Sequence, residues 1–164
     1  MTARYTIPLL ASTTLFAQQY TISTFAGGGT GGVVFNNPTS VAVDSEDNVY
    51  VADWSGVIRK IWAGGGGVTT VAGTGIPGYS GDGSQAAAAA IGKAISIALD
   101  SGGNLYIADA NNNRIRRVDA STGIITTVAG TGAATDSGDG GPAKNAGVSR
   151  PSGITVSATG DFYF

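Results

Sequence analysis

The stretch Asn104-Leu-Tyr-Ile-Ala-Asp109 decides the fold, because it also occurs, with two conservative changes, as Asn48-Val-Tyr-Val-Ala-Asp53. A second pair, Val71-Ala-Gly-Thr-Gly75 and Val128-Ala-Gly-Thr-Gly132, has nearly the same spacing: the first pair lies 56 positions apart and the second 57. A third copy reaches Asp161-Phe-Tyr-Phe164. Self-similarity at a fixed period of this length predicts a repeat architecture.

The composition favours an all-β fold. Glycine contributes 27 of the 164 residues, charged residues 12% and apolar residues 42%. Val, Ile, Thr and Tyr are prominent, which suits many short strands joined by Gly-rich turns. The chain has no cysteine and no histidine. It therefore offers no disulfide or thiolate chemistry, and it lacks both the commonest general base and the commonest zinc ligand.

The N-terminus resembles an export signal. Arg4 precedes a short apolar run, and Ala17 supplies a small residue for cleavage. We expect residues 1–17 to be a signal peptide and the protein to be secreted or periplasmic. No segment approaches the roughly twenty apolar residues of a membrane span. After cleavage, eight basic residues against eleven acidic ones leave a net charge of −3, which disfavours a nucleic-acid partner.

Each unit contains four strand-like segments separated by turn residues. Val41 and Val43 alternate on one face of the first segment. Glycine and asparagine in the turns tolerate the positive φ of tight hairpins. The predicted strands are 40–44, 49–53, 57–62 and 68–72 in the first unit, with 104–109, 114–119 and 124–129 as matching segments in the second.

Four antiparallel strands followed by a long connection are the plan of a β-propeller blade. A leucine-rich or hexapeptide solenoid needs a shorter period, and helical repeats need a 3.6-residue periodicity. Only the alanine-rich run 85–91 has high helix propensity. It aligns with residues 142–148, which makes it a variant of the linker between units. We expect two four-stranded sheets packed face to face, with Val41, Val43, Ile97 and Leu99 near the shared core, and a partial third sheet.

Three segments carry a resemblance to a known family. The residues Pro151-Ser-Gly-Ile-Thr-Val156, Asn104–Asp109 and Asn112-Asn-Arg-Ile-Arg-Arg-Val-Asp119 are similar to NHL repeats, and the Ser-Gly-Asp-Gly linkers are similar to those of bacterial secreted NHL proteins. The pattern departs at Lys93-Ala94, where the other copies carry Asn37-Pro38 and Arg150-Pro151.

The resemblance covers nearly everything after Tyr20, and it implies an NHL-type propeller of about two and a half repeats, an incomplete ring. The expected organisation is a closing strand at 20–26 with the first repeat in 18–67, the second repeat in 68–123, and a linker strand with a partial third repeat in 124–164.

Aspartates recur at two positions in each unit. Asp82 and Asp139 lie in the two Ser-Gly-Asp-Gly loops, where a calcium site and a plain Asx turn are the alternatives. The spacing does not match an EF-hand loop, so we favour the turn. Asp53 and Asp109 end the second strand of each unit. They either line one mouth of a propeller or cap the turn that follows. Recurrence favours capping, because a turn is needed in every copy. No metal ligand, catalytic residue or cofactor is predicted.

The third strands carry a basic stripe on an otherwise acidic chain. It is formed by Arg59, Lys60, Arg114, Arg116 and Arg117. The stripe is either an interaction surface for an acidic glycan or protein, or a solvated outer strand whose charges prevent edge pairing. Trp54 joins the candidate surface, because it stands where the second unit has Ala110 and because exposed Trp often anchors a contact. Filling a gap beside a Gly-rich run is its alternative role.

Two functions fit these residues. The first is a non-catalytic extracytoplasmic binding module that presents loops to a protein or glycan. The second is a fragment of a propeller enzyme, lyase or lactonase in type, whose catalytic blades lie elsewhere. We favour the binding module, since histidine ligands of a zinc-dependent propeller enzyme are lacking. A third reading is that the sequence is part of a longer protein, in which case self-association through open propeller edges is expected.

Overall fold

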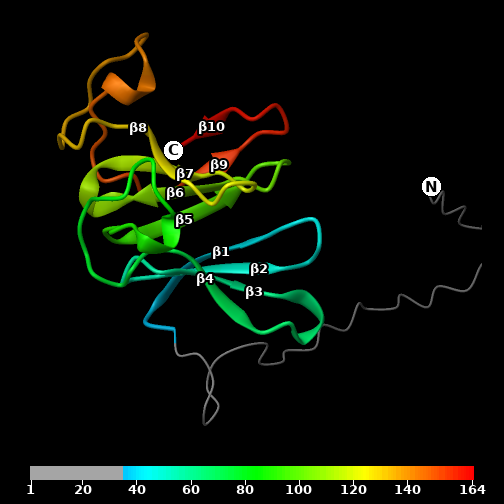
Figure 1. Cartoon of the computed structure of the whole chain (residues 1–164). Coiled ribbons are helices and arrows are strands. Elements are labelled where there is room, and N and C mark those ends of the chain that lie inside the picture. Colours follow the sequence, from blue (N-terminus) through cyan, green and yellow to red (C-terminus); the bar gives the residue numbers. More distant parts are fainter. Residues whose placement is uncertain (1–34) are drawn as a thin grey trace, which may run out of the picture.

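The computed structural model describes residues 35–164, which fold into three antiparallel sheets stacked one behind another (Figure 1). The first sheet has the order β1 (Pro38–Val43), β2 (Val49–Asp53), β3 (Ile58–Ile61), β4 (Val68–Ala72). The second has the order β5 (Ala94–Leu99), β6 (Leu105–Asp109), β7 (Arg114–Val118), β8 (Ile125–Ala129). The third pairs β9 (Thr155–Val156) with β10 (Phe162–Tyr163).

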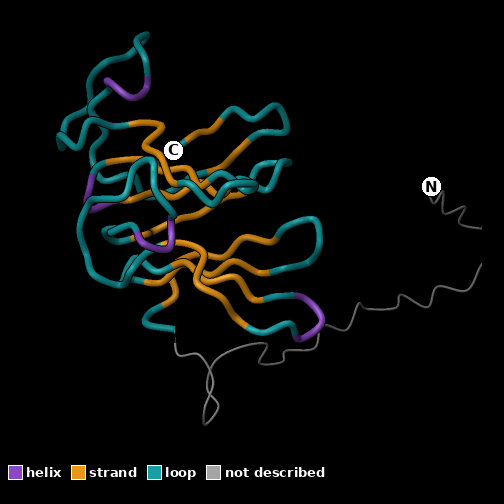
Figure 2. The backbone as a smooth tube through the Cα atoms, viewed as in Figure 1, coloured by secondary structure: helices purple, strands orange, loops and turns teal. Residues whose placement is uncertain are grey.

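The expected strands and the partial third sheet are therefore confirmed, and the fold is all-β and propeller-like. Four short 3₁₀ turns interrupt the connections (Figure 2): η1 (Ala63–Gly65), η2 (Ala86–Ala88), η3 (Ala110–Asn112) and η4 (Ala143–Asn145). The turns η2 and η4 occupy equivalent places in the two linkers, as their alignment predicts. The expected signal peptide at 1–17 and the closing strand at 20–26 lie outside the described residues.

The first hairpin of each four-stranded sheet begins at an aspartate. Asp44 Oδ1 accepts hydrogen bonds from the Glu46 and Asn48 amides at 3.0 and 2.9 Å. Asp100 Oδ1 accepts in the same way from the Gly102 and Asn104 amides, both at 2.9 Å. Aspartate side chains stabilise tight turns by this bond to the backbone two residues ahead, so the repeat of sequence becomes a repeat of local structure.

Two apolar cores lie between the three sheets. The first core lies between the first and second sheets. The second core lies between the other face of the second sheet and the third sheet. The first core contains Ala52, Ile58, Ala72, Ile97, Leu105, Ile107, Val118 and Ile125. The second contains Tyr106, Ala108, Ile115 and Ala129, against which Ile154, Val156 and Phe162 pack. Each sheet thus depends on its neighbours for burial, as in solenoids and propellers.

The prediction that Val41 and Val43 lie in the core between the sheets is wrong. Both side chains are exposed, at 64% and 57% of their surface, whereas Ile97 is 4% exposed. The sheets stack in the same orientation, so equivalent residues face the same way in each. Ile97 and Leu99 therefore face the first sheet, whereas Val41 and Val43 face away from the second sheet, on the outer face of the first. Ala42 takes the inward place that the prediction gave to these valines.

Serine hydroxyls join the first strands of successive sheets. Ser40 Oγ accepts a hydrogen bond from the Ile97 amide at 3.1 Å, and Ser96 Oγ accepts one from the Ile154 amide at 3.2 Å. The same bond thus forms at both sheet boundaries. Within residues 35–164, no helix has the length and apolar character to cross a bilayer.

Candidate functional site

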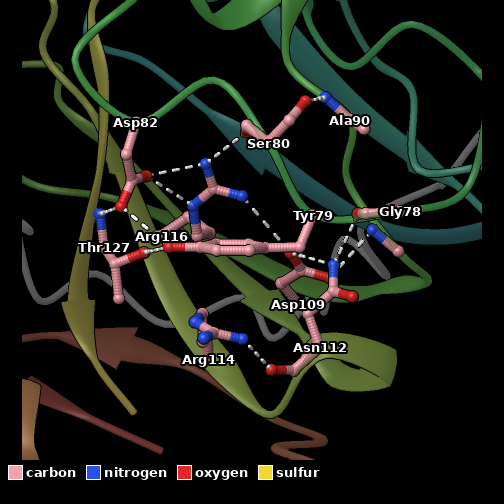
Figure 3. Close-up of polar contacts among 11 residues, drawn as sticks. Gly78, Tyr79, Ser80, Asp82, Ala90, Asp109, Asn112, Arg114, Arg116 and Thr127 are labelled. Carbon is pink, nitrogen blue, oxygen red and sulfur yellow. Dashed lines mark hydrogen bonds and ion pairs between the residues drawn. The ribbon is translucent and has the colours of Figure 1, made fainter. Parts of the chain in front are cut away.

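Polar side chains gather where the linker that follows the first sheet crosses the second sheet (Figure 3). The linker contributes Tyr79 and Asp82, and β7 contributes Arg114 and Arg116. Asp109, at the end of β6, lies beside Tyr79 and Asn112. Since the linker belongs to one repeat and the strands to the next, this cluster lies between repeats.

Arg116 is the centre of the cluster and is fully buried. Its Nε and Nη2 atoms donate to Asp82 Oδ1 at 3.1 and 2.8 Å, and Nη2 also donates to the Ser80 carbonyl at 2.9 Å. Register explains the burial: Arg116 lies opposite Ile107, on the face that packs against the first sheet. The planar guanidinium suits this arrangement because it presents several donors in a fixed geometry.

The third nitrogen of Arg116 is held only by charge. Nη1 lies 3.5 Å from Asp109 Oδ2, an ion-pair distance without hydrogen-bond geometry. Asp109 is itself buried and accepts hydrogen bonds from the Gly92 amide at 2.9 Å and from the Asn112 side chain at 2.9 and 2.8 Å. Burial raises the pKa of the Asp109 carboxyl, and these bonds together with the Arg116 charge oppose the rise only in part.

Burial and hydrogen bonding have opposite effects on the pKa of the Asp82 carboxyl. Burial alone would raise its pKa, but hydrogen bonds from Thr127, the Arg116 charge and the Tyr79 hydroxyl lower it. The second oxygen, Oδ2, accepts from the Thr127 amide and from the Tyr79 hydroxyl, both at 3.1 Å. The carboxylate is therefore the ionised partner of Arg116.

The Tyr79 ring makes cation–π contacts with two guanidinium groups, those of Arg114 and Arg116. The Arg114 guanidinium carbon lies 3.8 Å from the centre of the Tyr79 ring, and that of Arg116 lies 4.9 Å away. Arg114 also donates to the carbonyls of Asn112 and Thr131, at 2.8 and 2.5 Å. Cation–aromatic contacts of this kind add stability beyond apolar burial.

The first Ser-Gly-Asp-Gly loop is therefore not a plain Asx turn. The structure corrects that expectation for Asp82, whose carboxylate binds the next repeat instead of the amides of its own loop. Asp53 does cap the turn that follows it, since it accepts from the Ser55 amide at 3.0 Å. Asp109 differs, because its backbone donor is Gly92 of the preceding linker.

The first sheet has a simpler version of the cluster. Arg59 Nη1 donates to Asp53 Oδ2 at 2.6 Å. Burial raises the pKa of Asp53, but the Ser55 hydroxyl and Arg59 lower it further than burial raises it. On the other face, Lys60 Nζ lies 3.1 Å from Asp44 Oδ2.

Lys60 also lies over aromatic rings, with Nζ 4.0 Å from the centre of the Trp62 ring. The carboxyl that it pairs with is strongly stabilised in its charged form. Burial opposes ionisation of Asp44, but hydrogen bonds from Asn48 and Lys60 hold its pKa at about 2. Lys60 and Asp44 thus form a local pair within one sheet.

The structure divides the predicted basic stripe between two sheets and two faces. Arg59 pairs with Asp53 and Lys60 with Asp44, whereas Arg117 makes a longer contact of 3.4 Å with Asp119. Arg116 does not reach the surface, which corrects its place in the predicted interaction surface: alternation along β7 turns it toward the first sheet. Arg114 remains at the linker end, beside Tyr79.

Trp54 is exposed over 52% of its surface and is covered on one side by Lys93, whose Nζ lies 2.9 Å from the ring centre. Sequence reasoning missed Lys93, Tyr79 and the two serines of the first strands. Ser40 and Ser96 could have been found, because they recur 56 positions apart. Tyr79 has no counterpart, since Asp136 stands at its place in the second linker, so no repeat signal pointed to it.

The cluster is built for cohesion between repeats. Arg116 is paired with Asp82 and Asp109, and Arg114 donates to backbone carbonyls. Within residues 35–164, no three His, Cys, Asp or Glu side chains are grouped as a metal site would require. The arrangement joins a linker to the following sheet through one carboxylate, one guanidinium and one aromatic ring.

The family model of the NHL repeat matches residues 35–57 and 93–118. These ranges begin just before β1 and β5 and end near the third strand of each sheet. No curated protein matches the chain.

Solved structures share the arrangement of the sheets. A Bacteroides thetaiotaomicron VPI-5482 protein of unknown function superposes with a TM-score of 0.58 at 25% identity, covering 66% of this chain and 27% of its own. A catalytically inactive virginiamycin B lyase from Staphylococcus aureus, crystallised with quinupristin, superposes with a TM-score of 0.51 at 19% identity. That match covers 77% of this chain and 33% of the lyase, so the chain spans about a third or less of either protein. The likeness to the lyase shows the fold alone.

Proposed function

We propose that this chain, which matches the NHL repeat model over residues 35–57 and 93–118, is part of an NHL-type β-propeller that acts outside the cytoplasm as a non-catalytic scaffold for a protein or a glycan. The observation that carries the proposal is the pairing of charges between repeats. The buried Arg116 and the partly exposed Asp82 are bonded to each other across a repeat boundary. Groups used in this way hold sheets together and are not free to act on a substrate.

The binding surface that we propose is the end of the sheets where the linkers run. Trp54 and Lys93 lie there side by side, and Arg114 stands at the same end of the second sheet. Trp54 occurs once, since the second repeat has Ala110 in its place. A residue that breaks the repeat at an exposed position is better explained by contact with a partner than by the needs of the repeat, and Trp is a frequent anchor of such contacts.

A polysaccharide array tests the glycan arm of the proposal, and it uses the purified chain with two variants. Trp54→Ala should abolish or weaken binding to any glycan that the unchanged chain retains. Val43→Ala is the matched control, because Val43 is 57% exposed and lies at the opposite end of the first sheet, where β1 pairs with the start of β2. Equal binding by both variants and the unchanged chain would refute the assignment of this surface.

Export is tested by expressing the full chain in a bacterial host and measuring the mass of the protein in each compartment. Cleavage after Ala17 should yield a periplasmic or secreted protein that begins at Gln18. A full-length product that stays in the cytoplasm would contradict the proposed location.

The enzyme alternative draws support from a shared fold only. Incubation of the purified chain with quinupristin, followed by mass spectrometry of the remaining antibiotic, tests it directly. We expect quinupristin to stay intact, and its conversion by the chain would overturn the non-catalytic role.

A further inference from the structure

We propose that the linker end of the first two sheets binds an acidic polysaccharide, one whose sugar rings carry carboxylates. Trp54 and Lys93 make the first contact with it, and Tyr79 and Arg114 make the second. This ligand class rests on the proposed function, since it specifies which glycan the surface of Trp54, Lys93 and Arg114 takes. It also adds Tyr79 to that surface.

The two aromatic–cation pairs consist of residues that do not recur. Between the first and second repeats, none of the four positions keeps its residue: Ala110 corresponds to Trp54, Asp136 to Tyr79, Val57 to Arg114 and Asn37 to Lys93. Residues that build each sheet recur, as Asp53 and Asp109 do. Residues that occur once are better explained by a contact that is made once.

Lys93 carries a charge that no described carboxylate neutralises. Its Nζ lies 2.9 Å from the centre of the Trp54 ring, and within residues 35–164 none of the ion pairs below 4.0 Å includes it. The face of the ring attracts the ammonium but does not cancel its charge. More than half of the Trp54 surface is exposed, at 52%. An open aromatic surface therefore lies beside an unneutralised ammonium.

Arg114 and Tyr79 repeat this arrangement on the second sheet. The guanidinium carbon of Arg114 lies 3.8 Å from the centre of the Tyr79 ring, which is 44% exposed. The acceptors of Arg114 are the backbone carbonyls of Asn112 and Thr131. Carbonyls orient the guanidinium without removing its charge, and in the described part of the chain Arg114 forms no ion pair. A second open ring thus lies beside a second free charge.

One run of contacts joins the two pairs. Gly92 precedes Lys93, and a Cβ at Gly92 would lie 3.1 Å from Nδ2 of Asn112. The same Nδ2 donates to the Gly78 carbonyl at 2.7 Å, directly before Tyr79 (Figure 3). The two pairs are therefore neighbours on one surface, as contact with successive sugar rings of one polymer requires.

A sugar ring with a carboxylate fits this combination of groups. The C–H face of a pyranose packs on an aromatic ring, and Trp offers the largest such surface. Lysine is a compact, strongly hydrated charge, so it suits a compact, strongly hydrated anion such as a carboxylate. A neutral polysaccharide would leave both charges without a partner. Since the chain has 11 acidic residues against 9 basic ones, its net charge does not explain binding of a polyanion.

The test is isothermal titration of the purified chain with polygalacturonate and with the same polymer after methyl esterification, which removes its charge. The acidic polymer should bind at least about fivefold more tightly than the ester, since about fivefold is the upper range for one exposed ion pair. Lys93→Met keeps an apolar stem without the charge. It should weaken binding of the acidic polymer by about fivefold and leave binding of the ester unchanged. Lys93→Arg should restore most of the affinity, and Trp54→Ala should weaken binding of both polymers.

Lys144→Met is the matched control. Lys144 is exposed in η4, and among the described residues it lies over no aromatic ring. Its loss should leave both affinities unchanged, which separates the site from the overall charge of the chain.

Three results would overturn the acidic ligand class. They are equal binding of the two polymers, equal loss in Lys93→Met and Lys144→Met, and no binding of either polymer at millimolar sugar. Trp54-dependent binding of dextran sulfate without binding of polygalacturonate would overturn the choice of carboxylate. If both polymers bind equally but Trp54→Ala weakens both, the proposed glycan surface stands and only its acidic preference falls.

Discussion

Replacing Asp82 by alanine should destabilise the chain far more than the same change at Asp139, although the two residues occupy identical motifs. Asp82 accepts four hydrogen bonds, two of them from Arg116. In the described residues Asp139 forms no ion pair. The pair of variants therefore compares an occupied site with an open one.

The magnitude follows from what Arg116 would lose. Removing one partner of a buried ion pair costs about 3–5 kcal/mol. We expect about 3 kcal/mol for Asp82→Ala, at the low end of that range. The carboxylate is 37% exposed, and Arg116 keeps both the Ser80 carbonyl and the Asp109 charge. Exposed substitutions away from such contacts cost about 0.5 kcal/mol or less, which is our expectation for Asp139→Ala.

Urea denaturation followed by tryptophan fluorescence measures both variants, since Trp54 and Trp62 lie in the first sheet and its loops. With a slope of about 1.5 kcal/mol/M, the midpoint for Asp82→Ala should fall by about 2 M. That for Asp139→Ala should fall by about 0.3 M or less. Free energies of unfolding that differ by under about 0.5 kcal/mol between the variants would refute the view that Asp82 joins the repeats.

Three other changes have clear expected outcomes. Gly73→Ala should cost more in thermal melting than Gly83→Ala, because both glycines have positive φ but only at Gly73 would a Cβ overlap a backbone carbonyl, that of Gly56. Ser96→Ala should cost about 1–2 kcal/mol and speed hydrogen exchange at the Ile154 amide, which loses its acceptor. The pKa of Asp44 is about 2 in the folded chain against 3.8 ordinarily, so its stabilisation is present above pH 4 and is lost as the pH falls toward 2. Asp44→Asn should flatten that acid limb in urea titrations between pH 2 and 5.

The strands could be predicted because each strand sequence occurs twice, once in each repeat, and both copies show the same pattern. Val49–Asp53 and Val68–Ala72 have the bounds that the alternation indicates, and their turns carry aspartate or glycine in both copies. Local chemistry decides such elements, so the sequence contains the necessary information.

The direction in which a face packs could not be predicted. Alternation assigns Val41 and Val43 to one side of β1, but it does not say which side a neighbouring sheet covers. The apolar character of the two valines suggested that they lie in the core. The second sheet instead packs on the opposite face of β1, where the smaller Ala42 contacts the core. For the same reason alternation along β7 predicts an exposed Arg116, whether the basic stripe is an interaction surface or a solvated outer strand. Its burial depends on a partner 34 residues earlier in the chain, and no local pattern reports a contact of that range.

The bond between Asp82 and Arg116 also bears on how such chains can be lengthened by gene duplication. The linker that carries Asp82 follows one sheet, but its partner lies in the next. A duplicated segment that runs from the start of one sheet to the start of the next would contain the aspartate of its own linker. The arginine that pairs with this aspartate would come from the sheet that follows the duplicated segment. A new junction is therefore compatible only if the linker carries the aspartate and the sheet that follows carries the arginine. The unit that keeps this pair together consists of a linker and the sheet that follows it, and not of a sheet and the linker that follows it. Recombinants cut within the hairpin of β3 and β4, before the linker, should keep the pair together, and those cut between the linker and β7 of unrelated repeats should not.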